Sequence, residues 1–244
     1  MASRCLIRIL LVLALLLSGG LSTGLREVAA VPNKFDIGSG GMPTMTGNSG
    51  GFVTANASLL ADLVVTINFG ELSPANQSGV GTIPLVKVVV PIAIRSTAAY
   101  ELNMTVSPSG ALSADANAVQ LTDIGFGIRN LRPLGIDSTV CGGNSTVVSP
   151  FSNDPSQTVS LNGTTARAVY PSTLNSVGGS SVVMFGPQLS LFRNVPDFKR
   201  SNDNGWLFDA IFTIAPQYYS SGSVGPITLT FRITAASSCA CPCN

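Results

Sequence analysis

The segment I-T-L-T-F-R-I-T, from Ile227 to Thr234, alternates apolar and polar side chains at every position. Successive side chains of a β-strand point to opposite faces of its sheet. One face of this segment is therefore apolar and the other polar. The pattern predicts a strand that packs one face on a core and exposes the other to water.

The same alternation, or a short apolar run of β-forming residues, recurs upstream. The segments that show it are 63–69, 86–94, 100–106, 119–128, 181–185, 188–192 and 206–215. No segment carries a helical apolar stripe of useful length. Sheets with one apolar face are stable when two of them pack face to face, so we expect an all-β antiparallel sandwich. Pro91 lacks an N–H, and it predicts an edge position, a bulge or a bend within 86–94.

The first thirty residues predict a signal for export. Arg4 and Arg8 precede an apolar run at 9–17, which is too short to span a bilayer comfortably. The small residues Val28-Ala29-Ala30 predict cleavage after Ala30, and an uncleaved membrane anchor is the alternative. We therefore expect a protein that is secreted, extracellular or at the cell surface, with no stable membrane span after cleavage.

The rest of the chain is expected to divide by composition. A stretch rich in Gly, Ser, Thr, Asn and Pro predicts a flexible lead-in, in which Phe35 and Ile37 are the only hint of a strand. The middle of the chain, with many glycines and prolines, predicts hairpins or a small irregular insert, with short strands near 158–161 and 167–170. The expected organisation is a signal peptide at 1–30, a lead-in at 31–57, a β-sandwich domain at 58–236 with an irregular insert at 130–179, and a Cys-rich tail at 237–244.

Charge and residue content exclude several functions. The chain has 13 Lys and Arg, 12 Asp and Glu, and no His, for a net charge of +1. Such a balance is not the electrostatic footprint of a protein that binds nucleic acid or an anionic membrane. Without His, Ser-His-Asp and Cys-His catalysis and imidazole metal sites are excluded. Carboxylate-pair hydrolysis and simple binding remain open.

The cysteines of the exported part are candidates for disulfides, because exported thiols usually oxidise. They are Cys141, Cys239, Cys241 and Cys243, and the last three form C-A-C-P-C. We favour an intramolecular disulfide, in which one tail cysteine reaches Cys141, with a frayed tail. The alternative is a cross-link between subunits or a soft-metal clip. The spacing does not suit structural zinc, and no metal or cofactor is expected.

Acidic residues give only fragments of known sites. Asp197, Asp203 and Asp209 lie in and after N-V-P-D-F-K-R-S-N-D-N-G-W, which carries only part of a calcium-loop pattern and includes an ordinary turn at Asp203. Glu101 and Asp123 form a catalytic pair only if the fold brings them together.

Aromatic residues are few. Tyr218 and Tyr219 lie in a predicted turn and are the candidate surface for a ligand, such as a glycan. Trp206 begins an apolar strand, which favours a place in the core.

Two stretches carry a family resemblance. The ending I-A-P-Q-Y-Y-S-S-G-S-V-G-P-I-T-L-T-F-R-I (214–233) and the segment V-V-V-P-I-A-I-R-S-T-A-A-Y-E-L-N-M-T-V (88–106) resemble strands of bacterial pilin-like and spore-coat-U-like domains. The chain differs from that group in lacking an early cysteine pair and in its cysteine tail. The resemblance implies an immunoglobulin-like sandwich that serves as a structural or adhesive surface subunit. It also implies that the segment around Phe35 and Ile37 is a donor strand for a neighbour's open edge.

These observations predict a secreted, non-enzymatic structural or adhesive protein that associates with itself or with other surface proteins through edge strands or tail cysteines. The alternatives are an extracellular carbohydrate-binding module and, third, a carboxylate-dependent glycosidase.

Overall fold

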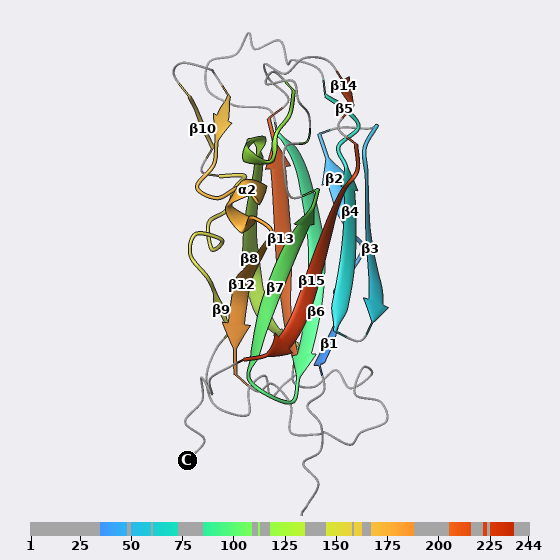
Figure 1. The fold of residues 1–244 in the computed structure, drawn as a ribbon, viewed down its shortest axis with the longest axis vertical. Coiled ribbons are helices and arrows are strands. Elements are labelled where there is room, and N and C mark those ends of the chain that lie inside the picture. The colour runs from blue at the N-terminus through green and yellow to red at the C-terminus, as the bar shows by residue number, and fades with distance from the viewer. Residues whose placement is uncertain are drawn as a thin grey trace, which may run out of the picture. The chain divides into compact units, whose positions relative to one another are not determined.

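Antiparallel strands form two packed sheets, as the alternation predicts (Figure 1). The computed structural model describes residues 35–47, 50–59, 61–72, 85–108, 112, 118–134, 145–157, 159–162, 167–187, 205–215, 222–223 and 225–236. All of them belong to one compact unit, Asn33–Asn244. The predicted signal peptide and Cys-rich tail lie outside the described residues.

The first sheet has five strands. Its order is β1-β6-β13-β8, and β2 also pairs with β6. The strands are β1 (Phe35–Ser39), β2 (Thr44–Thr46), β6 (Val86–Ser96), β8 (Ile124–Leu134) and β13 (Gly205–Ile214).

The second sheet has six strands, in the order β3-β4-β15-β7-β12-β9. It lies in front of the first in the view of Figure 1. The strands are β3 (Phe52–Leu59), β4 (Asp62–Asn68), β7 (Tyr100–Ser107), β9 (Thr146–Val147), β12 (Ser180–Gly186) and β15 (Ile227–Ala235).

Short elements complete the described part of the chain. Two small pairs are β5 (Glu71–Leu72) with β14 (Gly222–Ser223), and β10 (Ser160–Leu161) with β11 (Ala168–Val169). One 3-10 turn, η1 (Leu121–Asp123), and one helical turn, α2 (Leu174–Val177), are the helical elements.

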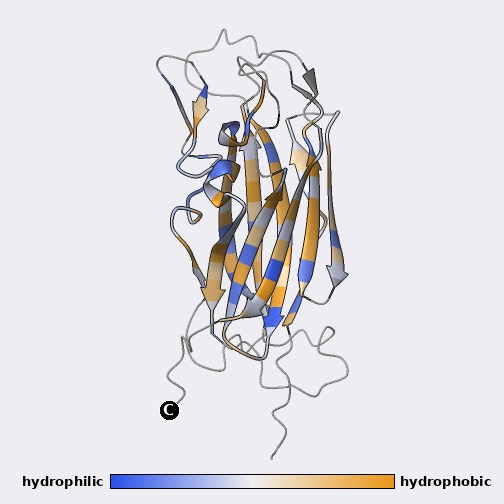
Figure 2. Cartoon of the chain, viewed as in Figure 1, coloured by the Kyte–Doolittle hydropathy of each residue, from blue (hydrophilic) through white to orange (hydrophobic). Residues whose placement is uncertain are grey.

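The apolar faces of the two sheets form one core. Ile227, Leu229 and Phe231 of β15 are fully buried, whereas Thr228 and Thr230, which alternate with them, are not. Figure 2 shows this alternation as bands of colour along the strands. Phe126 of β8 stacks on Phe212 of β13, with ring centroids 5.2 Å apart. Each fully buried Leu, Ile or Phe contributes about 1.5–3 kcal/mol, so a core of this kind offsets much of the ordering entropy.

Pro91 lies in a strand with neighbours on both sides. β13 pairs with β6 along its whole length, and Asp209 faces Pro91. On the other side, β1 ends opposite Ile92 and β2 begins opposite Val89. The amide of Gly40 donates to the Pro91 carbonyl over 2.8 Å, which shows that this side of Pro91 faces the break between β1 and β2. The missing N–H therefore falls where no ladder bond is needed.

The predicted lead-in at 31–57 is wrong for its described part. Residues 35–39 form β1, 44–46 form β2, and β3 begins at Phe52. The sandwich therefore includes residues 35–57 in their described part and does not begin only near Ser58. The side chains of β3 alternate between the two faces of the sheet, but the small inward residues make this pattern weak in the sequence. Val53 and Ala55 pack against the core, and Thr54 and Asn56 are exposed.

The insert contains short ordered pieces. β10 and β11 form an antiparallel pair within the two fragments that we expected to be short strands. The strand expected from residue 119 instead begins at Ile124, because η1 precedes it. Asp123 ends η1, and its carboxylate accepts a bond from the Gln120 amide over 2.8 Å, which holds this turn.

Candidate functional site

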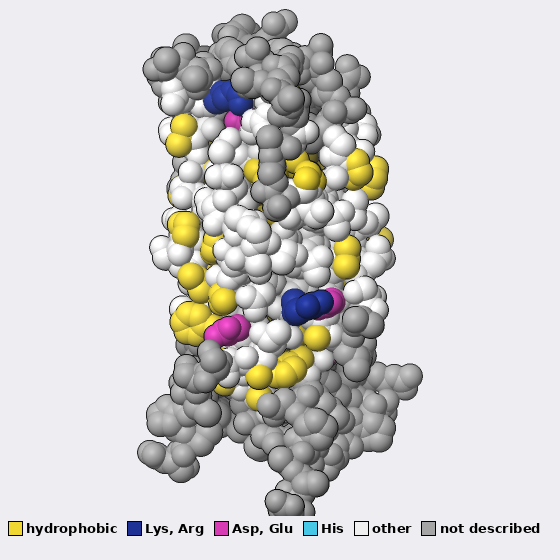
Figure 3. All heavy atoms as spheres, in the orientation of Figure 1, with side chains coloured by type: hydrophobic (Ala, Val, Ile, Leu, Met, Phe, Trp, Pro, Cys, Tyr) yellow, Lys and Arg dark blue, Asp and Glu magenta, His cyan; other side chains and the backbone are white. Residues whose placement is uncertain are grey.

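The outward face of the six-stranded sheet carries rows of polar side chains from several adjacent strands. Alternation places the polar residues of β15 and β7 on this face, and the sheet register aligns them in rows. Thr228 faces Ser107, Thr230 faces Thr105, and Arg232 faces Asn103. On the other side of β15, Thr66 of β4 faces Thr228, and Thr54 of β3 faces Thr66. Figure 3 shows this face, in which neither charged nor hydrophobic side chains dominate the centre.

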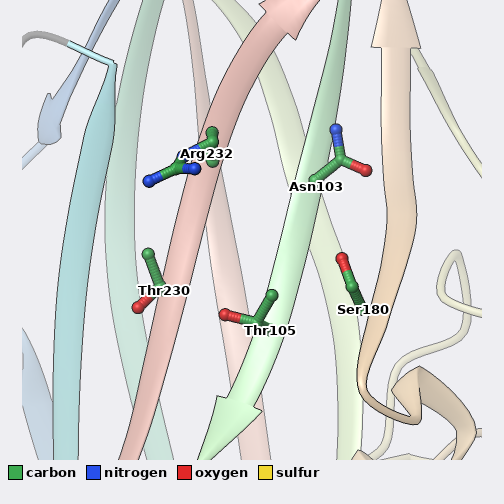
Figure 4. Close-up of a pocket in the computed structure, with 5 residues that line it drawn as sticks. All are labelled: Asn103, Thr105, Ser180, Thr230 and Arg232. Atoms are coloured by element: carbon green, nitrogen blue, oxygen red, sulfur yellow. The ribbon is translucent and has the colours of Figure 1, made fainter.

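A shallow hollow of about 360 Å³ opens on this face. Its lining consists of Asn103, Thr105, Ser180, Thr230 and Arg232, from β7, β12 and β15 (Figure 4). The Asn103 amide nitrogen donates to the hydroxyl of Thr234 over 3.3 Å. The hollow offers hydroxyl and amide groups, which can donate and accept hydrogen bonds with a polyhydroxylated ligand.

Arg232 is held at the rim by Asp62. Its Nε and Nη2 donate to Oδ1 and Oδ2 of Asp62 over 2.7 Å and 2.6 Å. These hydrogen bonds, with the guanidinium charge, hold the pKa of Asp62 below its usual value despite the burial of the carboxylate. The Asp62 carboxylate neutralises the Arg232 guanidinium, so the hollow does not present an unpaired positive charge to an anion.

The same pairing recurs elsewhere. Ion pairs join Arg95 to Asp36 over 3.4 Å, Arg167 to Asp123 over 2.8 Å, and Arg132 to Asp209 over 3.7 Å. Asp209 also accepts from the Asn130 amide over 2.7 Å. Four of the described aspartates are thus engaged by arginines.

The structure does not bring Glu101 and Asp123 together as a catalytic pair. Glu101 lies on β7, where it faces Thr234 and Phe185 of the neighbouring strands. Asp123 is buried before β8 of the other sheet and bonds to Gln120 and Arg167. Burial raises the pKa of Asp123, and this effect outweighs the hydrogen bonds and the Arg167 charge. Its geometry is that of a buried structural ion pair.

Several predicted site residues have no described position. Cys141, Cys239, Cys241 and Cys243 lie outside the described residues, and so do Tyr218 and Tyr219. Asp197 and Asp203 of the calcium-like segment also lie outside them. Trp206 is the second residue of β13 and is buried in the core, where its indole nitrogen has no hydrogen-bond partner among the described residues.

The predicted donor segment is paired within its own chain. β1 forms an antiparallel ladder with β6, in which Phe35 faces Ser96 and Ile37 faces Ile94. Ile37 is 1% exposed and belongs to the core. Phe35 packs against that core while remaining partly exposed. In this arrangement the segment completes the chain's own sheet edge.

Sequence reasoning missed the edge strand β3. It contains no charged residue and no proline, and its Phe52 is 49% exposed. Its only strand partner among the described residues is β4. The alternation of Val53, Ala55 and Ala57 with polar residues was the available signal, but the residues are small.

The described residues contain no cluster of three or more His, Cys, Asp or Glu residues with the geometry to hold a metal ion. No helix in the same part of the chain has the length and apolar character to cross a membrane. Comparisons of the chain with family models, with curated proteins and with solved structures found no match.

Proposed function

We propose that this chain is a secreted, non-enzymatic structural or adhesive surface protein that associates through a sheet edge, with its tail cysteines as a second contact. The export signal predicted from the sequence and the near-balanced charge of the chain support the location. The paired aspartates and the hydroxyl-rich face support binding rather than proton transfer, because a general acid or base must be free to exchange its proton with a substrate.

The observation that carries this proposal is the edge of β3. An uncharged edge strand presents unpaired backbone groups to any strand that approaches it, and soluble proteins usually block such edges with charge, proline or a cover. An eight-residue strand without these features favours association. A surface subunit gains its function from such contacts.

The test compares oxidised and reduced protein recovered from a secreting host. Non-reducing gels and size-exclusion chromatography should show multimers of the oxidised protein, and reduction should remove the part held by disulfides. A product that remains strictly monomeric under both conditions, up to the highest soluble concentration, contradicts the proposal.

A carbohydrate-binding role is the second candidate, and the hollow of Figure 4 favours it. Hydroxyls and an amide on three adjacent strands match the hydrogen-bonding pattern of a sugar. A glycan array with the unaltered chain, with Thr105→Val and with Tyr219→Ala separates the two proposed surfaces. Binding that only Thr105→Val removes assigns the hollow, whereas binding that only Tyr219→Ala removes assigns the tyrosine turn. No binding by the unaltered chain rejects this candidate.

A further inference from the structure

The two sheets differ in how their edges are protected. β8 pairs with β13 on one side. On its other side the amides of Phe126 and Ile128 donate to the carbonyls of Ser172 and Phe151 over 3.1 Å and 2.8 Å. Backbone from the irregular insert therefore covers this half of the edge.

The second half of β8 carries features that oppose pairing. Asn130 has a positive φ of 55°, a conformation that asparagine tolerates and that breaks the regular ladder. The register with β13 shifts at the same point, between Leu207 and Asp209. Arg132 and Pro133 follow, and charge and proline both hinder the addition of a strand.

The remaining edges of the described sheets are short. β9 consists of Thr146–Val147 and pairs with Met184 and Phe185 of β12, and just after it the Val148 amide donates to the Val183 carbonyl over 3.0 Å. On the other sheet, β1 and β2 divide the outer side of β6 into pieces of five and three residues. Edges of this length support few ladder bonds.

β3 is different in length and in chemistry. It runs for eight residues, F-V-T-A-N-A-S-L, with Thr54, Asn56, Ala57 and Ser58 exposed. Figure 1 shows it as the outermost strand of its sheet, beside β4. No described residue forms a strand pair with its outer edge. Phe52 adds a large apolar side chain at its start, 49% exposed.

Symmetry makes this edge complementary to itself. When a strand pairs antiparallel with its own copy about a two-fold axis, the numbers of facing residues add up to a constant. When this sum is even, Thr54 and Asn56 of one copy face outward-face residues of the other copy. Val53 and Ala55 then face core-face residues of the other copy. The backbone groups that point to the edge alternate with the same period, so the hydrogen-bonding residues also meet one another. No charge on either strand opposes this approach.

We propose that β3 pairs antiparallel with β3 of a second copy of this chain, which joins the two six-stranded sheets into one continuous sheet across a dimer. This inference rests on the proposed function, because it names the partner and the contact of the associating edge. A contact between identical edges is isologous and closes at two copies. Longer assemblies then need another contact, for which the tail cysteines are the candidates in the sequence.

The interface of one pair of edge strands is small, so the dimer is expected to be weak, with a dissociation constant on the order of tens of micromolar. The strand pairing is measured on reduced protein, where disulfides do not contribute. Sedimentation equilibrium over a concentration series gives the dissociation constant. Hydrogen exchange at low and high protein concentration shows which amides become protected.

The test variant is the double substitution Thr54→Lys with Asn56→Lys. Both side chains are exposed on the edge strand, and across the two-fold axis the added charges repel those of the other copy. Thr122→Lys with Asn175→Lys is the matched control, because it changes the same residue types at exposed positions in η1 and α2. Urea unfolding of each variant identifies any loss of fold.

We expect the unaltered protein and the control to form dimers, and the edge variant to dissociate at least about tenfold more readily. The amides of β3 should gain protection with concentration. A monomeric reduced protein overturns the inference, and so does an edge variant that dimerises as the control does. Concentration-dependent protection of β1 in place of β3 also overturns it, because it indicates exchange of the donor segment. If the reduced protein is monomeric while the oxidised protein forms multimers, the edge contact is rejected, and of the proposed function only a surface protein held together by disulfides remains.

Discussion

Asp62 and Arg232 face each other across β4 and β15 and form a two-pronged ion pair, with N–O distances of 2.7 Å and 2.6 Å. The two residues lie 170 positions apart in the chain, and the pair therefore ties the last strand to an early one. The Asp62 side chain is 8% exposed, whereas that of Arg232 is 59% exposed. Burial of the Asp62 carboxylate on folding costs desolvation free energy, and the ion pair with Arg232 offsets much of that cost.

The pH dependence of stability should reveal this pair. The pKa of Asp62 is lower in the folded chain than in the unfolded chain, where it is about 3.9. The ionised carboxylate therefore stabilises the fold above about pH 4, and this contribution is lost as the pH falls through the lowered pKa. Asp62→Asn should unfold at lower urea concentration than the unaltered chain near neutral pH, and the difference should shrink toward about pH 2.

Glu101→Gln serves as the control for Asp62→Asn, since Glu101 forms no ion pair among the described residues. A difference for Asp62→Asn that stays constant from neutral to acid pH contradicts the role of the pair.

Asp123 should show the opposite sign. Burial raises its pKa above that of the unfolded chain, so its contribution to stability is fully present below about pH 4 and is lost as the pH rises through the raised pKa. The stability difference between the unaltered chain and Asp123→Asn should therefore fall as the pH increases above about 4. Urea unfolding at closely spaced pH values checks this. A difference that grows with pH would show that Arg167 outweighs desolvation.

The aromatic cluster between the sheets should dominate the core energetics. Phe212 is fully buried and stacks on Phe126, which also contacts Phe151 at 5.4 Å between ring centroids. Phe212→Ala should lower the free energy of unfolding by about 3–5 kcal/mol. Phe52→Ala, at a half-exposed edge position, should change it by less than about 1 kcal/mol. Equal losses for the two substitutions would contradict the described core.

The strands that sequence analysis predicted share one property: large side chains alternate in them. From Ile227 to Ile233 in β15 and from Val86 to Ile94 in β6, every second residue is a Val, Ile, Leu or Phe, and those residues are buried. β2 and β3 were missed, and β1 was indicated only by Phe35 and Ile37, because the inward residues of these strands are few or small, as Ala55 shows. In such segments local composition resembles that of a loop, and only the pairing with β6 and β4 decides the structure.

The candidate site could be predicted only in part. The polar residues of β7 and β15 follow from alternation, but their alignment in rows depends on register between strands far apart in the chain. Asn103 faces Arg232, and no pattern within either strand specifies that pairing. That no described strand covers the outer edge of β3 depends in turn on where the other described strands lie, which no local pattern specifies.

The cover on β8 gives a further prediction, because it rests on a glycine. A Cβ on Gly127 would collide with the backbone carbonyl of Asn153 and approach the Pro155 ring to 2.9 Å. The carbonyl belongs to the backbone that covers the strand, so Gly127→Ala should displace this segment and cost about 1–3 kcal/mol. Protease should then cut the displaced insert more readily. The uncovered β8 edge should increase self-association of the reduced protein.

Gly38→Ala is the matched control, because a Cβ there meets no atom within 4 Å and Gly38 also lies in a strand of the same sheet. It should leave the unfolding midpoint, the proteolysis rate and the association constant close to those of the unaltered chain. If Gly127→Ala matches this control in all three measurements, the insert does not protect the edge of β8 from pairing with another strand. The protection of β8 would then rest on its second half alone, where Asn130, Arg132 and Pro133 oppose the addition of a strand, whereas β3 carries neither charge nor proline.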